Sequence, residues 1–153
     1  MSGFNAGHSS FNFLTASRDV SLHSFDLCGF GYERTMASYL QQKFPGRLNF
    51  TIGNSLTSVR SYFNAKRSLT CDIISVDGGH GGNVPLKDIQ NLAKVASQPH
   101  NVIFVDDLNI RAVRNAWRVA TKSGIVKGLF VFGCSFKSFA VGTVPQQKPL
   151  SLT

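Results

Sequence analysis

The chain has 153 residues, of which 42% are apolar, and it carries a formal net charge of +8. This length is enough for a single domain with a hydrophobic core, and no linker rich in Pro, Ser or Gly divides it. No apolar stretch approaches the ~20 residues of a membrane span, and the first residues lack the basic and apolar segments of a signal peptide. We therefore expect a soluble, cytoplasmic protein with no membrane partner.

Cysteine and basic residues carry little further information. Cys28, Cys71 and Cys134 are odd in number and lack metal-ligand spacing, so we expect neither a disulfide framework nor a zinc site. The largest basic group follows helical spacing, and a solvated helix face explains it more simply than a nucleic-acid surface does. Its members are Arg111, Arg114, Arg118 and Lys122.

The predicted elements alternate between helix and strand along the chain. After a glycine-containing turn at 3–10, we expect a short helix over 11–16. The further helices are 32–44, 55–65 with Ser55 as its cap, 84–96, and one from Ile110 that stops near Gly124. The strands are 20–26, 48–52, 72–77 and 101–106, and the runs 129–132 and 139–144 predict an antiparallel hairpin. This order predicts a layered α/β domain over 1–145 and a flexible tail over 146–153.

Three apolar runs end in aspartate, at Asp26, at Asp77 and at the pair Asp106 and Asp107. Buried parallel strands of this kind meet at their carboxyl ends, where α/β sheets bind ligands. Four of the eight carboxylates in the chain lie at these ends. This placement predicts a ligand site along one edge of the sheet.

A glycine turn also precedes the first of these strands. Gly3 and Gly7 are followed about twenty residues later by Asp26, a spacing at which an acid can hold ribose hydroxyls beside a glycine-rich turn. The alternative for Asp26 is a carboxylate that caps a helix or fixes a loop.

The whole order of motifs resembles the class I S-adenosylmethionine-dependent methyltransferases, and most closely the methyltransferase-24 type family. The resemblance rests on Gly3-Phe4-Asn5-Ala6-Gly7-His8-Ser9, Ser24-Phe25-Asp26-Leu27, Gly53-Asn54-Ser55, Val76-Asp77-Gly78-Gly79-His80 and Val105-Asp106-Asp107-Leu108. It implies a Rossmann-like sheet with helices on both faces and a C-terminal antiparallel hairpin. It also implies that Gly3, Asn5 and Gly7 line the methionine end of the cofactor, that Asp26 binds the ribose, and that Asn54 and Ser55 flank the adenine.

Asp77, Asp106 and Asp107 form a candidate metal site. Three carboxylates suit a hard cation such as Mg²⁺, and both Asp106 and Asp107 can be ligands only if the strand ends before them. The alternative is that Asp107 caps the next helix while Asp106 ends the strand. In the cation-dependent O-methyltransferases that the pattern resembles, the metal holds a hydroxyl of a small-molecule acceptor, whose lowered pKa favours methyl transfer.

Two histidines complete the candidate residues. We place His80 and Asp77 as catalytic candidates, because His80 can act as a general base near neutral pH. It can equally orient the cofactor or fix its loop, and His8, beside the glycine turn, has the same alternatives.

One element of the resembled family is missing from this sequence. In that family, a central first strand precedes the glycine turn and carries an acid two residues before the first glycine. In this sequence that position is Met1. We therefore expect a sheet without its middle strand. We also expect weak S-adenosylmethionine binding and easy unfolding unless upstream sequence supplies that strand.

Three other functions remain open at this point. An inactive or fragmentary methyltransferase-like binding domain would keep the fold without the reaction. A nicotinamide-dinucleotide oxidoreductase would share the glycine turn and Asp26, but does not predict the other aspartates or the hairpin. A basic RNA-binding module would use the +8 charge.

Overall fold

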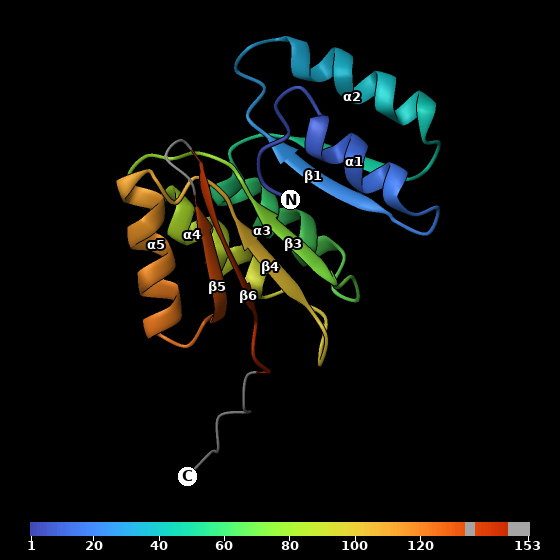
Figure 1. Cartoon of the computed structure of the whole chain (residues 1–153). Helices are drawn as coiled ribbons and strands as arrows, with labels where there is room; N and C mark the ends of the chain where they lie inside the picture. Colours follow the sequence, from blue (N-terminus) through green and yellow to red (C-terminus); the bar gives the residue numbers. More distant parts are fainter. Residues whose placement is uncertain (134–136, 147–153) are drawn as a thin grey trace.

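The computed structural model describes residues 1–133 and 137–146. Its helices are α1 (His8–Ala16), α2 (Tyr32–Lys43), α3 (Ser55–Ala65), α4 (Val84–Ala93) and α5 (Arg111–Lys122). Its strands are β1 (Leu22–Asp26), β2 (Leu48–Ile52), β3 (Ile73–Val76), β4 (Val102–Val105), β5 (Lys127–Gly133) and β6 (Ser138–Thr143). The expected alternation of helix and strand and the closing hairpin are confirmed (Figure 1).

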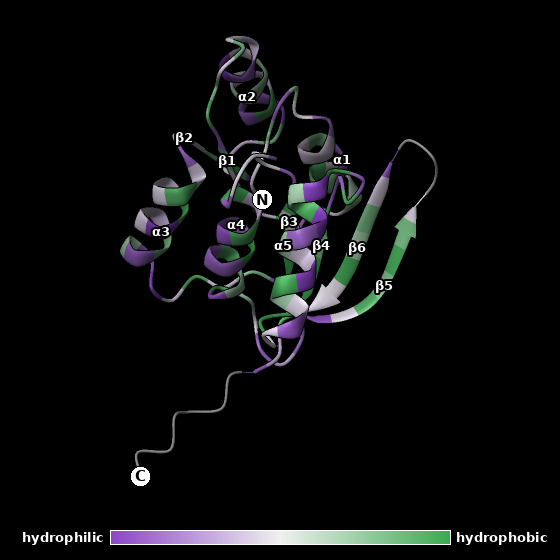
Figure 2. Cartoon of the chain, turned by 90° about the vertical axis from the view of Figure 1, so that its left-hand side faces the viewer, coloured by the Kyte–Doolittle hydropathy of each residue, from purple (hydrophilic) through white to green (hydrophobic). Residues whose placement is uncertain are grey.

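The strands form two groups that lie side by side. β1 and β2 pair in parallel, and β3 and β4 pair in parallel within a second group of order β3-β4-β6-β5. β6 is antiparallel to both β4 and β5. The outer strand β5 is apolar along much of its length, and its residues 129–132 are each more than half exposed (Figure 2).

Helices cover both faces of this arrangement, as expected. One core cluster packs α3, α4 and α5 beneath β1, β3, β4 and β6, with Val59, Ile89 and Ala120 fully buried. A second, smaller cluster packs α1 and α2 against β1 and β2 around Leu14 and Leu40. Burial of these apolar stripes is the main force that holds helices of this length in place.

The first three residues join the two groups of strands. Ser2 forms parallel bridges to Phe25 of β1 and Val76 of β3, and the N-terminus lies between these strands (Figure 1). The Ser2 N–H donates to the Ser75 carbonyl at 3.0 Å, and the Gly3 N–H donates to the Phe25 carbonyl at 2.9 Å. The expected gap in the middle of the sheet is therefore closed at its carboxyl end by Met1–Gly3.

Element boundaries shift by a few residues from the sequence expectation. β3 and β4 each stop one residue before their aspartate, and α4 ends at Ala93 instead of residue 96. The expected cap at Ser55 is wrong, because Asn54 is the N-cap of α3 and its side chain accepts the Leu56 N–H at 3.0 Å. Both residue types favour this position, so the sequence alone does not decide between two neighbours.

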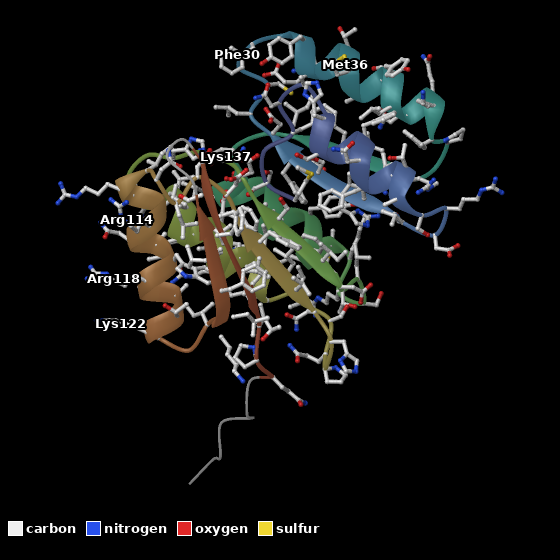
Figure 3. All side chains as sticks on the ribbon, viewed as in Figure 1. Phe30, Met36, Arg114, Arg118, Lys122 and Lys137 are labelled. Carbon is white, nitrogen blue, oxygen red and sulfur yellow. The ribbon has the colours of Figure 1, made fainter. Side chains whose placement is uncertain are left out.

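The remaining expectations concern charge, thiols and the tail. Arg114, Arg118 and Lys122 point outward from α5, as a solvated basic face requires (Figure 3). Cys28 and Cys71 are free thiols, whereas Cys134 and the tail beyond residue 146 lie outside the described residues. Within residues 1–133 and 137–146, no helix has the length and apolar character needed to cross a membrane.

Candidate cofactor and metal site

A cavity of about 460 Å³ opens at the carboxyl ends of β1, β2 and β3. This volume lies in the range of small-molecule sites, and its position is the one at which α/β sheets bind ligands. Five of the seven expected cofactor-binding residues line it: Gly3, Asn5, Asp26, Asn54 and Ser55. The expected catalytic residues Asp77 and His80 line it as well.

Gly3 is held where no side chain fits. Its φ is +81°, and a Cβ atom there would lie 1.9 Å from the backbone oxygen of Asp77. The bare backbone lets the first turn of the chain pass directly against the end of β3. Gly3 thereby places the glycine turn directly against Asp77, the first residue of the candidate metal site.

Asp26 organises this turn through both carboxylate oxygens. Its Oδ2 accepts the N–H groups of Phe4 and Asn5 at 2.7 and 3.0 Å, and its Oδ1 accepts the N–H of Cys28 at 2.7 Å. Asp26 thus fixes two loops at the cavity wall, which is the structural alternative to ribose binding that the sequence leaves open. Binding of ribose by the remaining lone pairs stays a prediction.

Gly7 and His8 are not among the residues that line the cavity. Gly7 is the N-cap of α1 with φ +78°, and a Cβ atom there would lie 2.9 Å from the Phe4 ring. Its role in the structure is therefore the turn into α1. His8 is exposed at the start of that helix, and contact of either residue with a cofactor stays a prediction.

The structure brings Asp77, His80 and Asp107 together as a group that can hold a metal ion. One ligand atom from each lies within 4.8 Å of the others. His80 Nε2 lies 3.1 Å from Asp107 Oδ2. Carboxylate oxygens suit Mg²⁺ and Mn²⁺, and an imidazole nitrogen suits transition metals such as Fe and Zn, so the donor set fits a divalent cation.

Asp106 occupies a different position from its neighbour. Its Oδ2 forms an ion pair with Lys137 Nζ at 2.9 Å, and its Oδ1 accepts the Asp107 N–H at 2.8 Å. Asp107 has φ +56°, which turns its side chain toward His80 after β4 has ended. The helix-cap alternative for Asp107 is wrong, because Ile110 is the N-cap of α5.

Electrostatics single out Asp77 among the three carboxylates. Burial, followed by the negative charges of Asp106 and Asp107, raises the pKa of Asp77 to about 6, against the opposing effects of Lys137 and His80. A cation at this position would relieve that repulsion. The cluster therefore combines suitable ligand atoms with an excess of negative charge.

A second cavity of about 500 Å³ adjoins the first and also reaches Asp77. Apolar rings make up much of its wall, and Asp106 and Lys137 are charged residues at its edge. The rings belong to Phe13, Phe104, Phe132 and Phe139. Asp77 is the residue that lines both cavities.

Sequence reasoning missed two charged residues of this site. Glu33 on α2 is 1% exposed, lines the first cavity, and accepts the Phe30 N–H through Oε1 at 3.0 Å, while its Oε2 has no hydrogen-bond partner among the described residues. A buried acceptor of this kind fits the hydroxyl and amine donors of S-adenosylmethionine. An acid in the first turn of a helix after Gly-Phe-Gly was its only sequence signal. Lys137 gave none, since it lies before β6 and its partner Asp106 follows β4, thirty-one positions earlier in the sequence.

Comparison with known proteins now decides the family. The family model described as a methyltransferase domain matches residues 2–108, which include both candidate groups of the site. The chain belongs to this family. This methyltransferase is S-adenosylmethionine-dependent and of class I, and the match favours it over the dinucleotide oxidoreductase alternative.

Solved structures share the fold of this methyltransferase at low sequence identity. CalS11, a TDP-rhamnose 3'-O-methyltransferase of calicheamicin biosynthesis, has a TM-score of 0.69 and 10% identity, over 91% of this chain and 69% of that one. Human methyltransferase-like protein 13, in complex with S-adenosylhomocysteine, has a TM-score of 0.65 and 14% identity, over 98% and 73%. The O-methyltransferase NcsB1 of neocarzinostatin biosynthesis, bound to S-adenosylhomocysteine and 1,4-dihydroxy-2-naphthoic acid, has a TM-score of 0.61 and 16% identity, over 94% and 48%. None of the curated protein sequences compared with the chain matches it.

Proposed function

We propose that this methyltransferase transfers a methyl group from S-adenosylmethionine to a hydroxyl group of a small molecule, with a divalent cation held at Asp77 and Asp107. O-methyltransferases among the structures of similar fold support the choice of oxygen as acceptor. The observation that carries the proposal is the position of Asp77, between the cofactor cavity and the second cavity and within the candidate metal group.

The first cavity would hold the cofactor. Glu33 Oε2 and the free lone pairs of Asp26 offer acceptors for its hydroxyl and amine groups. Asn54 and Ser55 also line this cavity, and there the start of α3 would meet the adenine. Gly3 keeps the backbone close enough for the methionine end to lie near Asp77.

The second cavity would hold the acceptor. Its phenylalanine rings would pack against an apolar body, while its edge at Asp77 would bring a hydroxyl toward the cofactor cavity. Closeness and alignment of the two reactants supply much of the rate enhancement of a group transfer. Two adjoining cavities that share Asp77 support that arrangement.

The proposed reaction requires the acceptor to lose a proton. The carbon–sulfur bond of the sulfonium breaks as the carbon–oxygen bond forms, and the hydroxyl proton passes to His80, whose Nε2 is held by Asp107 at 3.1 Å. Imidazole is the commonest general base in enzymes. When bound at the two carboxylates, a divalent cation would lower the pKa of a hydroxyl that it coordinates.

The proposal is tested with Mn²⁺ and with a panel of small hydroxylated acceptors. Electron paramagnetic resonance should show one Mn²⁺ site, weakened at least tenfold in Asp77→Asn and Asp107→Asn. The matched control Asp72→Asn, an exposed aspartate at the opposite end of β3, should leave it unchanged. Release of S-adenosylhomocysteine with the panel should depend on added cation and fall about a hundredfold in His80→Gln.

Two results would contradict parts of this function. Turnover that is unaffected by EDTA would contradict the need for a cation but would still support methyl transfer to a hydroxyl. Tight binding of S-adenosylmethionine with no turnover on any hydroxyl acceptor would favour the inactive binding domain instead.

A further inference from the structure

The outward face of α5 is a row of positive charges. Arg111, Arg114, Arg118 and Lys122 are all exposed and follow one another at intervals of three and four residues. The last three of these side chains extend away from the molecule (Figure 3). Side chains at these intervals are neighbours on a helix, so their like charges repel one another. A bound polyanion would relieve this repulsion.

Acidic side chains do not balance this row. The sequence has no Asp or Glu from Leu108 to Thr153, although seven Lys and Arg residues lie there. The one acid of α4, the helix that packs beside α5, is Asp88, and it is fully buried. Asp106 and Asp107, which precede α5, pair with other basic side chains, and no ion pair joins a cation of α5 to a carboxylate within the described part of the chain.

A groove of about 450 Å³, which we call the α4–α5 groove, runs beside this row. Arg111, Asn115 and Val119 line it from α5, and Asn83 and Leu86 line it from the side of α4. Val119 is 42% exposed and gives the groove an apolar wall together with Leu86. Asn83 is the N-cap of α4, but its side chain makes no capping hydrogen bond. The groove thus joins an apolar surface and amide donors and acceptors to a row of cations.

A single-stranded nucleic acid has both of the chemistries that this surface offers. Its phosphates match a row in which three of the four cations are Arg, whose guanidinium group binds phosphate through two hydrogen bonds. Its bases have apolar faces and polar edges, which match the wall and the amides of the groove. The row from Arg111 to Lys122 is about 17 Å long. This is about the length of five nucleotides at the rise of a nucleic-acid strand.

Two other polyanions match this surface less well. An anionic membrane is bound by helices that insert an apolar face, but the apolar face of α5 is buried in the core. Its buried residues are Val113, Ala116, Trp117 and Ala120. An acidic peptide would pair with the cations but would leave the apolar wall and the amides of the groove without a partner.

We propose that α5 and the α4–α5 groove bind single-stranded nucleic acid. The phosphates lie along Arg111, Arg114, Arg118 and Lys122, and one base lies in the groove beside Asn115. The site is separate from the cavities that would hold the cofactor and the small-molecule acceptor, since none of these residues lines either cavity.

The probe is a fluorescein-labelled thymidylate decamer, titrated with the intact chain and followed by fluorescence anisotropy. We expect one saturable site whose affinity falls about fiftyfold between 50 and 200 mM salt, because four phosphates release their counterions. A decamer with the same backbone but no bases should bind about tenfold more weakly, since it cannot fill the groove. Tighter binding of a uridylate decamer than of thymidylate would identify RNA as the partner, and the reverse would identify DNA.

Variants of the chain separate this surface from the net charge of the protein. The triple variant Arg114→Ala, Arg118→Ala, Lys122→Ala should bind at least tenfold more weakly, and the slope of log affinity against log salt should decrease by about 2. The matched control removes three exposed cations elsewhere and should change the affinity by less than about twofold. It is the triple variant Arg60→Ala, Lys66→Ala, Arg67→Ala. Circular dichroism of both shows whether each is folded.

The groove has a variant of its own. Asn115→Ala should weaken binding of the thymidylate decamer and leave binding of the decamer without bases unchanged, because only the first places a base beside the amide.

Three outcomes would overturn the proposal. Absence of saturable binding to either decamer that carries bases would show that the surface does not take a nucleic-acid strand. Equal losses in the two triple variants would show that net charge alone is responsible. Binding of decaglutamate or of phosphatidylserine vesicles that is as tight as that of the thymidylate decamer would assign the surface to an acidic protein or to a membrane.

Discussion

β1 and β3 are held together at one end and separate at the other. At their carboxyl ends, Met1–Gly3 bridges them, and Asp26 and Asp77 lie on either side of a built cavity. At their amino ends the same two strands face each other across a groove. The two ends of one strand pair thus differ: backbone hydrogen bonds through Met1–Gly3 join β1 and β3 at their carboxyl ends, whereas a groove separates them at their amino ends.

The largest loss of stability should come from a larger side chain at Gly3, where the backbone lies against the carboxyl ends of β1 and β3. We expect Gly3→Ala to lower the free energy of unfolding by about 4 kcal/mol or more, because a Cβ atom there would overlap the Asp77 backbone oxygen. Gly31 has a similar φ of +88° but open space around it, so Gly31→Ala should cost only the ~1–2 kcal/mol of left-handed strain. Urea unfolding of both variants measures the difference, and equal losses would show that the bridge by Met1–Gly3 is not tight.

The next effect concerns the carboxylate that holds the turn. Asp26→Ala leaves the N–H groups of Phe4, Asn5 and Cys28 without their acceptor, so we expect a loss of about 3 kcal/mol and weaker binding of S-adenosylhomocysteine. Asp19→Ala, at an exposed position, is the matched control. A stability of Asp26→Ala equal to that of this control would argue against the role of Asp26 in fixing the loops.

At the amino end, the buried ammonium should make stability depend on pH. Burial lowers the pKa of Met1 from 8.0 to about 6, so between these values the unfolded chain binds more protons than the folded one. The free energy of unfolding should therefore rise by about 2 to 3 kcal/mol from pH 6 to pH 8. The lowered pKa of His23 acts in the same direction near pH 6.

Asp77 should act with the opposite sign in a lower window. Its pKa is raised from 3.8 to about 6, so the folded chain binds more protons there and stability should fall as pH rises from about 4 to 6. Thermal unfolding across pH 4 to 8 should therefore show a minimum near pH 6. Acetylation of the N-terminus should flatten the rise above pH 6 alone, and a rise that survives acetylation would contradict the assignment to Met1.

The smallest expected effect is a difference in Mn²⁺ affinity between variants of the adjacent residues Asp106 and Asp107. Asp107→Asn removes a ligand of the candidate metal group, whereas Asp106→Asn removes a charge that pairs with Lys137 and no member of that group. We expect Mn²⁺ affinity to fall about tenfold in the first variant and less than twofold in the second. Equal losses of Mn²⁺ affinity would show that Asp106 is also a metal ligand, as the sequence predicts.

The sequence predicted most of the fold because its signals are local. Apolar runs that end in Asp26, Asp77 and Asp106 predicted the strands and the edge at which the candidate site lies. Which carboxylate meets which partner depends on contacts between elements, such as Lys137 with Asp106 or His80 with Asp107, and no spacing along the chain reveals them. Met1 and Ser2, before the glycine turn, are likewise too few to show a strand pattern, although Ser2 bridges two strands in the structure.

Binding of S-adenosylmethionine at the carboxyl edge is the central claim, and amide resonances of the intact chain test it directly. Titration with S-adenosylmethionine should saturate and shift the amides of Gly3, Asn5, Asn54 and Gly79, which line the first cavity, while those of Arg118 and Val119 on α5 stay in place. Shifts confined to other surfaces, or no saturable change at millimolar cofactor, would contradict the account.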